Sequence, residues 1–181
     1  IFGPTQKAAQ LESSKDFAKR FMVRHKIPTA AHATFTDAAA AHAYIDQQGA
    51  PIVIKADGLA AGKGVVVAAS LVEAHAAVDM MLVGNKMGAA GARVVIEQFL
   101  AGEEASFIVL ADGKHALPLA SSQDHKRLLD NDAGPNTGGM GTYSPAPIFT
   151  ESHEREVMEK MIFPTLRGLA SEGTPYIGVL F

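Results

Sequence analysis

A glycine-rich loop that carries lysine near both ends is the segment of this sequence best suited to binding phosphate. It runs from Lys55 to Gly64 as Lys-Ala-Asp-Gly-Leu-Ala-Ala-Gly-Lys-Gly. Glycines such as Gly58 and Gly62 let backbone N–H groups approach phosphate oxygens that a Cβ atom would hold away. Lys55 and Lys63 would add positive charge. An ordinary flexible hairpin loop is the alternative interpretation.

This loop does not match the Walker A pattern of P-loop NTPases. Counting back five residues from Gly62 gives Asp57 where that pattern has glycine, and Gly64 stands where Ser or Thr should bind magnesium. Strand-forming residues follow the loop, where a P-loop is followed by a helix. The sequence therefore disfavours a P-loop NTPase.

Acidic residues flank a short break between two strand-like segments in the stretch 97–106. Glu97 precedes the break, and Glu103 and Glu104 follow it. Adenine offers an amino donor and ribose offers hydroxyl donors, so carboxylates near free backbone groups suit both parts of a nucleotide. Solvated hairpin positions are the alternative interpretation of Glu103 and Glu104.

A third candidate lies in residues 121–147, which are rich in Gly, Pro, Asn and Asp and show no hydrophobic periodicity. Lys126 and Arg127 are adjacent cations that could hold an anionic substrate, and the glycines of 134–141 present backbone donors. A solvated charge pair is the alternative for the two cations. A structureless loop of this length inside a compact domain is usually functional or disordered.

Other kinds of site have little support in the sequence. The chain has no cysteine, which excludes thiolate metal sites and a cysteine nucleophile. Its seven histidines are scattered without the i, i+4 pairing of a zinc hydrolase. Ser121 and Ser122 lack the nucleophile-elbow pattern of serine hydrolases. A zinc hydrolase and a serine hydrolase are therefore disfavoured.

A β-α-β-β-α pattern is predicted for residues 30–92, and it places the glycine-rich loop between two strands. Thr36 can cap a first helix that Gly49 ends, and Ser70 opens a second helix. The strand-like segments between these helices are 51–55 and 65–68.

The rest of the chain is predicted to frame this unit. A helix capped by Ser13 precedes it, and antiparallel sheet follows it. Thr150 then caps a long helix to about Ser171, which Pro164 should bend or end. The fold class is α/β (α+β), with an entry segment and linking helix at 1–29, a small lid at 30–92 and part of a larger antiparallel-sheet domain at 93–181.

Composition indicates a soluble globular protein. The chain has 181 residues, of which 48% are hydrophobic and 19% charged, with a formal charge of −3. This charge creates no general attraction to nucleic acid or anionic lipid, and no apolar run approaches the ~20 residues that span a bilayer. No nucleic-acid or membrane partner is expected, and a cytoplasmic location is predicted.

The chain resembles the glycinamide ribonucleotide synthetase family of ATP-grasp ligases from end to end. The strings most specific to that family are Lys-Ala-Asp-Gly-Leu-Ala-x-Gly-Lys-Gly at 55–64 and Gly-Pro-Asn-Thr-Gly-Gly-Met-Gly at 134–141. The other matching segments, in order along the chain, are 2–4, 10–15, 27–29, 102–107 and 123–127.

The resemblance implies an ATP-grasp fold that holds the nucleotide between its two parts, and it implies a ligase reaction. ATP with Mg²⁺ would phosphorylate the carboxylate of glycine, because a carboxylate is a poor acyl donor until phosphate makes one oxygen able to leave. The amine of 5-phosphoribosylamine would then attack the glycyl phosphate. The products would be glycinamide ribonucleotide, ADP and phosphate.

The resemblance also implies roles at matching positions. Those expected to contact ATP phosphates are Lys15, Lys55 and the loop residues Gly58, Gly62, Lys63 and Gly64. Those expected to bind adenine and ribose are Glu97, the backbone of Phe99 and Leu100, and Glu104. Those expected to face glycine and phosphoribosylamine are Asp124, His125, Lys126, Arg127, Asn136, Thr137 and Gly138, with Lys126 and Arg127 as the catalytic cations.

The family pattern extends past both ends of this chain. In the family, the Glu and Asn that bind Mg²⁺ lie in a Glu-Phe-Asn-Cys-Arg-Phe-Gly-Asp-Pro-Glu segment beyond the last strand of this sequence, and a further domain precedes the matching region. The chain is therefore expected to be an internal fragment whose Mg²⁺ ligands lie outside it. A nucleotide-binding module without catalysis and another ATP-grasp carboxylate-amine ligase stay open as alternatives.

Overall fold

The computed structural model describes residues 2–58, 64–84, 91–131 and 133–181. Its contacts divide the chain into two compact units. The first unit consists of Gln10–Phe21 and Thr29–Ala101. The second unit consists of Ile1–Ala9, Met22–Pro28 and Gly102–Phe181.

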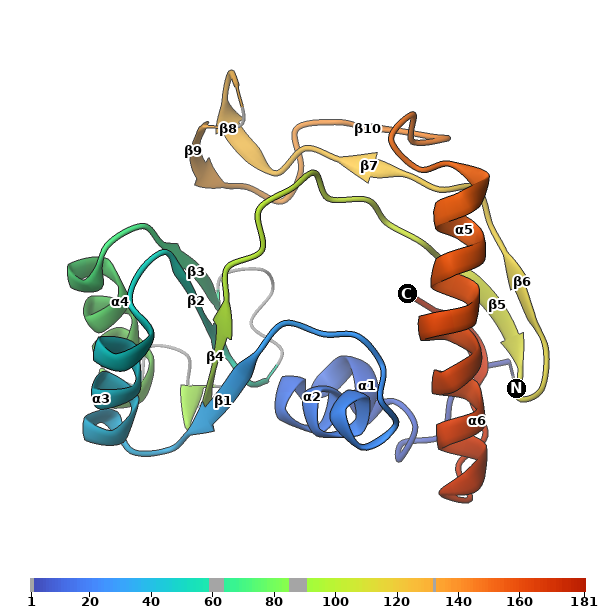
Figure 1. Ribbon diagram of the computed structural model, residues 1–181, viewed down its shortest axis with the longest axis horizontal. Coiled ribbons are helices and arrows are strands. Elements are labelled where there is room, and N and C mark those ends of the chain that lie inside the picture. The colour runs from blue at the N-terminus through green and yellow to red at the C-terminus, as the bar shows by residue number, and fades with distance from the viewer. Residues whose placement is uncertain (1, 59–63, 85–90, 132) are drawn as a thin grey trace. The chain divides into compact units, whose positions relative to one another are not determined.

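The first unit is built on an antiparallel sheet whose strands lie in the order β1-β4-β2-β3. Helices α3 and α4 cover one face of this sheet (Figure 1). The elements are α1 (Gln10–Ser13), α2 (Lys15–Arg24, which continues into the second unit from Met22), β1 (His32–Phe35), α3 (Ala38–Gln48), β2 (Ile52–Ala56), β3 (Val65–Ala68), α4 (Leu71–Val78), the π-helix η1 (Asp79–Val83) and β4 (Val94–Gln98).

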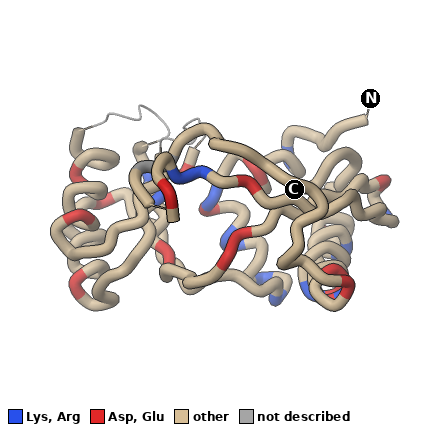
Figure 2. Tube along the Cα trace, turned by 90° about the horizontal axis from the view of Figure 1, so that it is seen from above, with Lys and Arg blue, Asp and Glu red and all other residues tan. Residues whose placement is uncertain are grey.

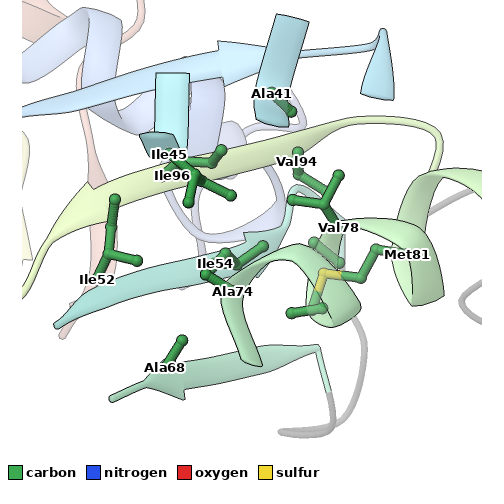
Figure 3. Close-up of a cluster of buried hydrophobic side chains, with 12 residues drawn as sticks. Ala41, Ile45, Ile52, Ile54, Ala68, Ala74, Val78, Met81, Val94 and Ile96 are labelled. Atoms are coloured by element: carbon green, nitrogen blue, oxygen red, sulfur yellow. The ribbon is translucent and has the colours of Figure 1, made fainter. Parts of the chain in front are cut away.

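The core of the first unit lies between this sheet and its two helices. Alternate residues of a strand face opposite sides of the sheet, so Ile52 and Ile54 of β2 point to the same side. They meet Ile45 of α3 and Val78 of α4 in the cluster that Figure 3 shows, and all four side chains are at most 3% exposed. The burial of these apolar side chains is the main force that holds the helices on the sheet.

The predicted β-α-β-β-α order of residues 30–92 is confirmed, and two helix caps differ from the prediction by one residue. Asp37, next to the predicted Thr36, accepts a hydrogen bond from the N–H of Ala40 at 2.8 Å. Ser14, next to the predicted Ser13, accepts one from the N–H of Phe17 at 3.1 Å. In each case the next residue along the chain has the geometry that lets its oxygen reach the third N–H of the helix.

The boundary between the two compact units does not lie between residues 92 and 93, where the sequence predicts that the lid ends and the larger domain begins. The reason is strand β4. The strand pairs with β1 on one side and with β2 on the other, and it supplies the buried residues Val94 and Ile96 to the core of the first unit. The compact units therefore divide at Ala101 and Gly102. A strand whose two neighbours are more than 35 residues away in the sequence cannot be assigned to its sheet by local pattern.

The second unit combines a three-stranded antiparallel sheet, in the order β11-β5-β6, with a long helical segment. The predicted turn at Asp112 and Gly113 joins β5 to β6, and Gly113 has a φ of 96° there. The elements are β5 (Val109–Asp112), β6 (Ala116–Pro118), β7 (Gln123–Asp124), β8 (Arg127–Leu129), β9 (Ala133–Asn136), β10 (Thr142–Tyr143), α5 (Glu151–Val157), the π-helix η3 (Met158–Ile162), α6 (Phe163–Ser171) and β11 (Ile177–Leu180).

The long helix predicted after Thr150 is confirmed, and it runs past Pro164 to Ser171. Proline cannot donate to the preceding turn. The chain meets this constraint with the π-helical turn η3, in which Phe163 donates to the carbonyl of Met158, and with Pro164 in the first turn of α6. No helix in the part of the chain that the structure describes is both long enough and apolar enough to cross a bilayer.

The interpretation of residues 121–147 as a structureless loop is wrong, because the segment contains four short strands. Strand β7 pairs with β10, and β8 pairs with β9, each in antiparallel register. Two hydrogen bonds, from His125 N to Gly141 O at 2.9 Å and from Met140 N to His125 O at 2.7 Å, join the two sides of the segment. These strands have two to four residues, too short for a periodic pattern to appear in the sequence.

Acid should weaken the second unit at Glu172. This carboxylate accepts hydrogen bonds from Arg24 Nε at 2.8 Å and pairs with His25 Nε2 at 2.7 Å, and these contacts lower the pKa of Glu172 below its ordinary value of 4.5. Because the folded-state pKa is the lower one, the stabilisation is present above pH 4.5 and is lost as the pH falls through the folded-state pKa.

We therefore expect Glu172→Gln to reduce the free energy of unfolding at pH 7 by about 1 kcal/mol or less, since the pair is partly exposed and screened. Urea unfolding of both proteins between pH 3 and pH 7 would measure the difference. It should shrink toward zero at the acid end of that range. A difference that stays constant down to pH 3 would contradict this origin.

Candidate functional site

A buried carboxylate between two lysines is the centre of the candidate site in the first unit. Glu97 Oε2 lies 3.0 Å from Lys55 Nζ and 3.1 Å from Lys19 Nζ. The side chains of Glu97 and Lys19 are 8% and 10% exposed, and that of Lys55 is 27% exposed. One carboxylate thus faces two ammonium groups, and Lys55 is the one that still reaches solvent.

The register of the sheet explains why Lys55 and Glu97 meet. Val53 pairs with Glu97 and Lys55 pairs with Val95, so Lys55 and Glu97 are diagonal neighbours on one face of the sheet. Ile54 and Ile96 alternate with them and face the helices. The same two strands therefore build the apolar core on one face and the ionic cluster on the other.

Helix α2 brings Lys15 to the start of the glycine-rich loop. Lys15 Nζ donates to the carbonyl of Gly58 at 3.3 Å. Asp57 fixes this arrangement, because its carboxylate accepts from the N–H of Asp16 at 2.8 Å and from the hydroxyl of Ser14 at 3.1 Å. The beginning of the helix and the beginning of the loop are thus held together.

Burial lowers the pKa of the Lys15 ammonium below its ordinary value of 10.5; Asp57 opposes this shift and the positive charge of Lys55 adds to it. A lysine whose charge is disfavoured in this way gains when an anion binds beside it. With the excess positive charge around Glu97, the cluster suits the phosphates of a nucleotide.

A second cluster of predicted residues lies within the second unit. Lys126 Nζ lies 2.5 Å from Glu104 Oε1 and 3.6 Å from Asp124 Oδ2. Partial burial acts to lower the pKa of Lys126, but the hydrogen bond and charge of Glu104 outweigh it and raise that pKa. A predicted ribose ligand and a predicted catalytic cation are therefore ion-paired with each other.

The neighbouring predicted residues are held by the short strands. Arg127 donates to the carbonyl of Gly134 at 2.6 Å, and the N–H of Thr137 donates to the carbonyl of Lys126 at 2.6 Å. The ring of His125 packs on Tyr143 with centroids 5.3 Å apart. Gly138 is exposed. The two hydrogen bonds hold Arg127 beside Gly134 and Lys126 beside Thr137, and the substrate-binding roles of these residues stay predictions.

For the other predicted site residues, the structure gives a position but no contact that bears on the predicted role, or it does not describe the residue. Phe99 and Leu100 follow β4 and are 37% and 64% exposed. Gly64 is buried, and its carbonyl accepts from the N–H of Ala56 at 2.8 Å. Gly62 and Lys63 lie outside the described residues, as does the side chain of Asn136. The roles of all these residues stay predictions, as does the placing of a nucleotide between the two units.

Sequence reasoning missed Lys19 as part of the site. Its spacing from Lys15 could have identified it. Lys19 is four residues after Lys15, and residues four apart on a helix lie on the same face. Lys19 Nζ also donates to the hydroxyl of Thr29 at 2.7 Å. Arg93 was missed as well, and it pairs with the buried Asp16 at 2.8 Å.

Among the described residues, no group of three or more His, Asp or Glu side chains could hold a metal ion. Both lysines contact the Oε2 atom of Glu97. Acidic and basic positions are interspersed along the chain (Figure 2).

Comparison with known sequences identifies relatives across nearly the whole chain. A family model described as phosphoribosylglycinamide synthetase, ATP-grasp (A) domain, matches residues 13–181. The chain is 68% identical over 181 residues to a phosphoribosylamine–glycine ligase of Ralstonia nicotianae. It covers 43% of that protein, so it spans less than half the length of this curated relative.

Solved structures give the same picture at the level of the fold. A phosphoribosylamine–glycine ligase from Thermotoga maritima matches with a TM-score of 0.90 and 38% identity, covering 99% of this chain and 45% of that one. A biotin carboxylase from Campylobacter jejuni, solved as a β-γ-ATP complex, matches with a TM-score of 0.70 and 19% identity, covering 98% and 38%. The second likeness concerns the fold alone.

Proposed function

We propose that this chain, which belongs to the phosphoribosylglycinamide synthetase ATP-grasp domain family, binds ATP as part of a phosphoribosylamine–glycine ligase. The observation that carries the proposal is the lysine cluster at the start of the glycine-rich loop. Lys15 and Lys55 both belong to the first unit. Lys15 contacts Gly58 of that loop, and Lys55 lies in the strand that leads into the loop. Their roles as phosphate ligands follow from the family pattern and agree with the charge of the cluster.

The proposed reaction begins with transfer of the γ-phosphoryl group of ATP to the carboxylate of glycine. In such a transfer the protein acts mainly by positioning the groups and stabilising negative charge. Lys55 would stabilise phosphate charge, and Lys126 and Arg127 would hold the glycine carboxylate or the phosphate of phosphoribosylamine. The amine of 5-phosphoribosylamine then displaces phosphate from glycyl phosphate. Glycinamide ribonucleotide, ADP and phosphate are released, a step of purine biosynthesis.

Two further parts of the proposal rest on the family pattern. Mg²⁺ would be bound by residues outside this chain. The full-length protein is expected in the cytoplasm, with small-molecule substrates and neither nucleic acid nor membrane as a partner.

The assay that tests this function uses the full-length protein with ATP, Mg²⁺, glycine and 5-phosphoribosylamine. We expect ADP release that requires both glycine and phosphoribosylamine, with one glycinamide ribonucleotide formed for each ADP. Omission of each substrate in turn is the control. ATP binding without glycine-dependent ADP release would instead support the nucleotide-binding module, and ADP release with a different carboxylate would support another ATP-grasp ligase.

A further inference from the structure

We infer that Lys19 is a positioning residue for ATP binding, because it shares the Glu97 carboxylate and so leaves the charge of Lys55 available to phosphate. The inference rests on the proposed ATP-binding function. Lys19 lies outside the glycine-rich loop and outside the segments that carry the family resemblance.

The geometry gives Lys19 a fixed position against Glu97. Its ammonium lies 3.1 Å from Glu97 Oε2 and donates to the hydroxyl of Thr29 at 2.7 Å. Its side chain is only 10% exposed. Lys19 is therefore committed to the carboxylate, whereas Lys55, at 27% exposure, is partly open.

The charges explain why this arrangement matters for an anion. Lys19 and Lys55 contact the same oxygen atom of Glu97, so one negative charge is divided between two ammonium groups. Without Lys19, Glu97 would form a one-to-one ion pair with Lys55. A phosphate would then compete with a carboxylate that is only 3.0 Å away and is desolvated, where charge interactions are stronger than in water.

The burial of Lys19 favours a functional explanation for its charge. Burying an ammonium is costly, and apolar residues of similar volume are often at least as stabilising as a buried ion pair. Lys19 lies on α2 one helical turn after Lys15, so a single helix face presents both lysines toward the same region. Lys15 contacts the loop directly, and Lys19 acts on Lys55 through Glu97.

Lys19→Met in the full-length protein tests the inference. We expect the Kd and the KM for ATP to rise roughly tenfold, the size expected for loss of one charge-assisted hydrogen bond. The value of kcat at saturating ATP should change much less, since Lys55 itself is still present. Lys19→Gln keeps a hydrogen-bond donor but removes the charge, and it should weaken ATP binding in the same direction. It carries the test if Lys19→Met does not fold.

A second change separates this role from a structural one. In a Glu97→Gln background, the additional change Lys19→Met should cause little further loss of ATP affinity, because the carboxylate through which Lys19 acts is already absent. A structural role predicts the opposite, because two buried changes then add. Arg20→Met is the matched control, since Arg20 is the next residue of α2 and its side chain is 68% exposed. Its ATP affinity should equal that of the unaltered protein.

Calorimetric titration with ATP measures these affinities without relying on the ligase reaction. If the unaltered protein binds no ATP, the proposed function fails. If it binds ATP and both Lys19 variants bind with unchanged affinity, the inference about Lys19 fails while the proposed function stands. A double variant that binds ATP roughly tenfold more weakly than Glu97→Gln alone would also overturn the inference.

Discussion

Lys55→Ala is expected to lower kcat of the full-length ligase by about 10²-fold, the typical effect of removing one group that stabilises charge in the transition state. ATP binding should weaken as well. Lys55 lies at the end of β2, next to the glycine-rich loop, and its ammonium is the partly exposed partner of Glu97. Because phosphate charge shifts during transfer, the loss should affect both the ground state and the transition state.

Steady-state kinetics with varied ATP measures the effect on kcat and on KM separately. Lys160→Ala is a matched control, because it removes the same charge from an exposed lysine that pairs with Glu156 on the surface. That variant should retain full activity. A Lys55→Ala enzyme with unchanged kcat and unchanged ATP affinity would remove Lys55 from the site.

Glu104→Ala is expected to raise the KM for ATP by roughly tenfold to hundredfold, since a charge-assisted hydrogen bond to a ribose hydroxyl contributes ~1.5 to 3 kcal/mol. The value of kcat should stay nearly unchanged, because the ribose does not react. The pairing of Glu104 with Lys126 gives this prediction a second part. Loss of Glu104 removes the hydrogen bond that raises the pKa of Lys126, so that pKa should fall.

The neighbouring carboxylate provides the comparison for this variant. Glu103→Ala makes the same chemical change at an exposed residue of the same segment. We expect its KM for ATP to match that of the unaltered enzyme. If Glu104→Ala leaves ATP binding unchanged and Glu103→Ala weakens it, the ribose ligand is Glu103.

Local patterns were enough to predict most of the elements. The order of strands and helices in residues 30–92 is confirmed, as are the helix end at Gly49 and the cap at Ser70. The ATP-grasp fold predicted from the resemblance is confirmed by the family match and by the likeness to solved structures. The element order, the helix end and the cap depend on neighbouring residues, because caps, turns and periodicity act within a few positions of the chain.

The candidate site was predictable in composition but not in its pairings. The chemistry of the glycine-rich loop and the presence of Lys55, Glu97, Glu104 and Lys126 could be proposed from the sequence. Their ionic partners could not. Glu97 was expected to bind adenine, and the structure shows its side chain in ion pairs with two lysines. Its adenine role stays a prediction.

The sequence by itself determined which residues can form strands, helices and phosphate-binding loops in this protein, since those properties depend on side-chain chemistry and local backbone geometry. Only the tertiary structure decided that β4 belongs to the sheet of the first unit and that Lys19 lies against Glu97. Both depend on which distant strands pair and in what register. A shift of one residue in β4 would turn Glu97 toward the apolar core and Ile96 toward the lysines.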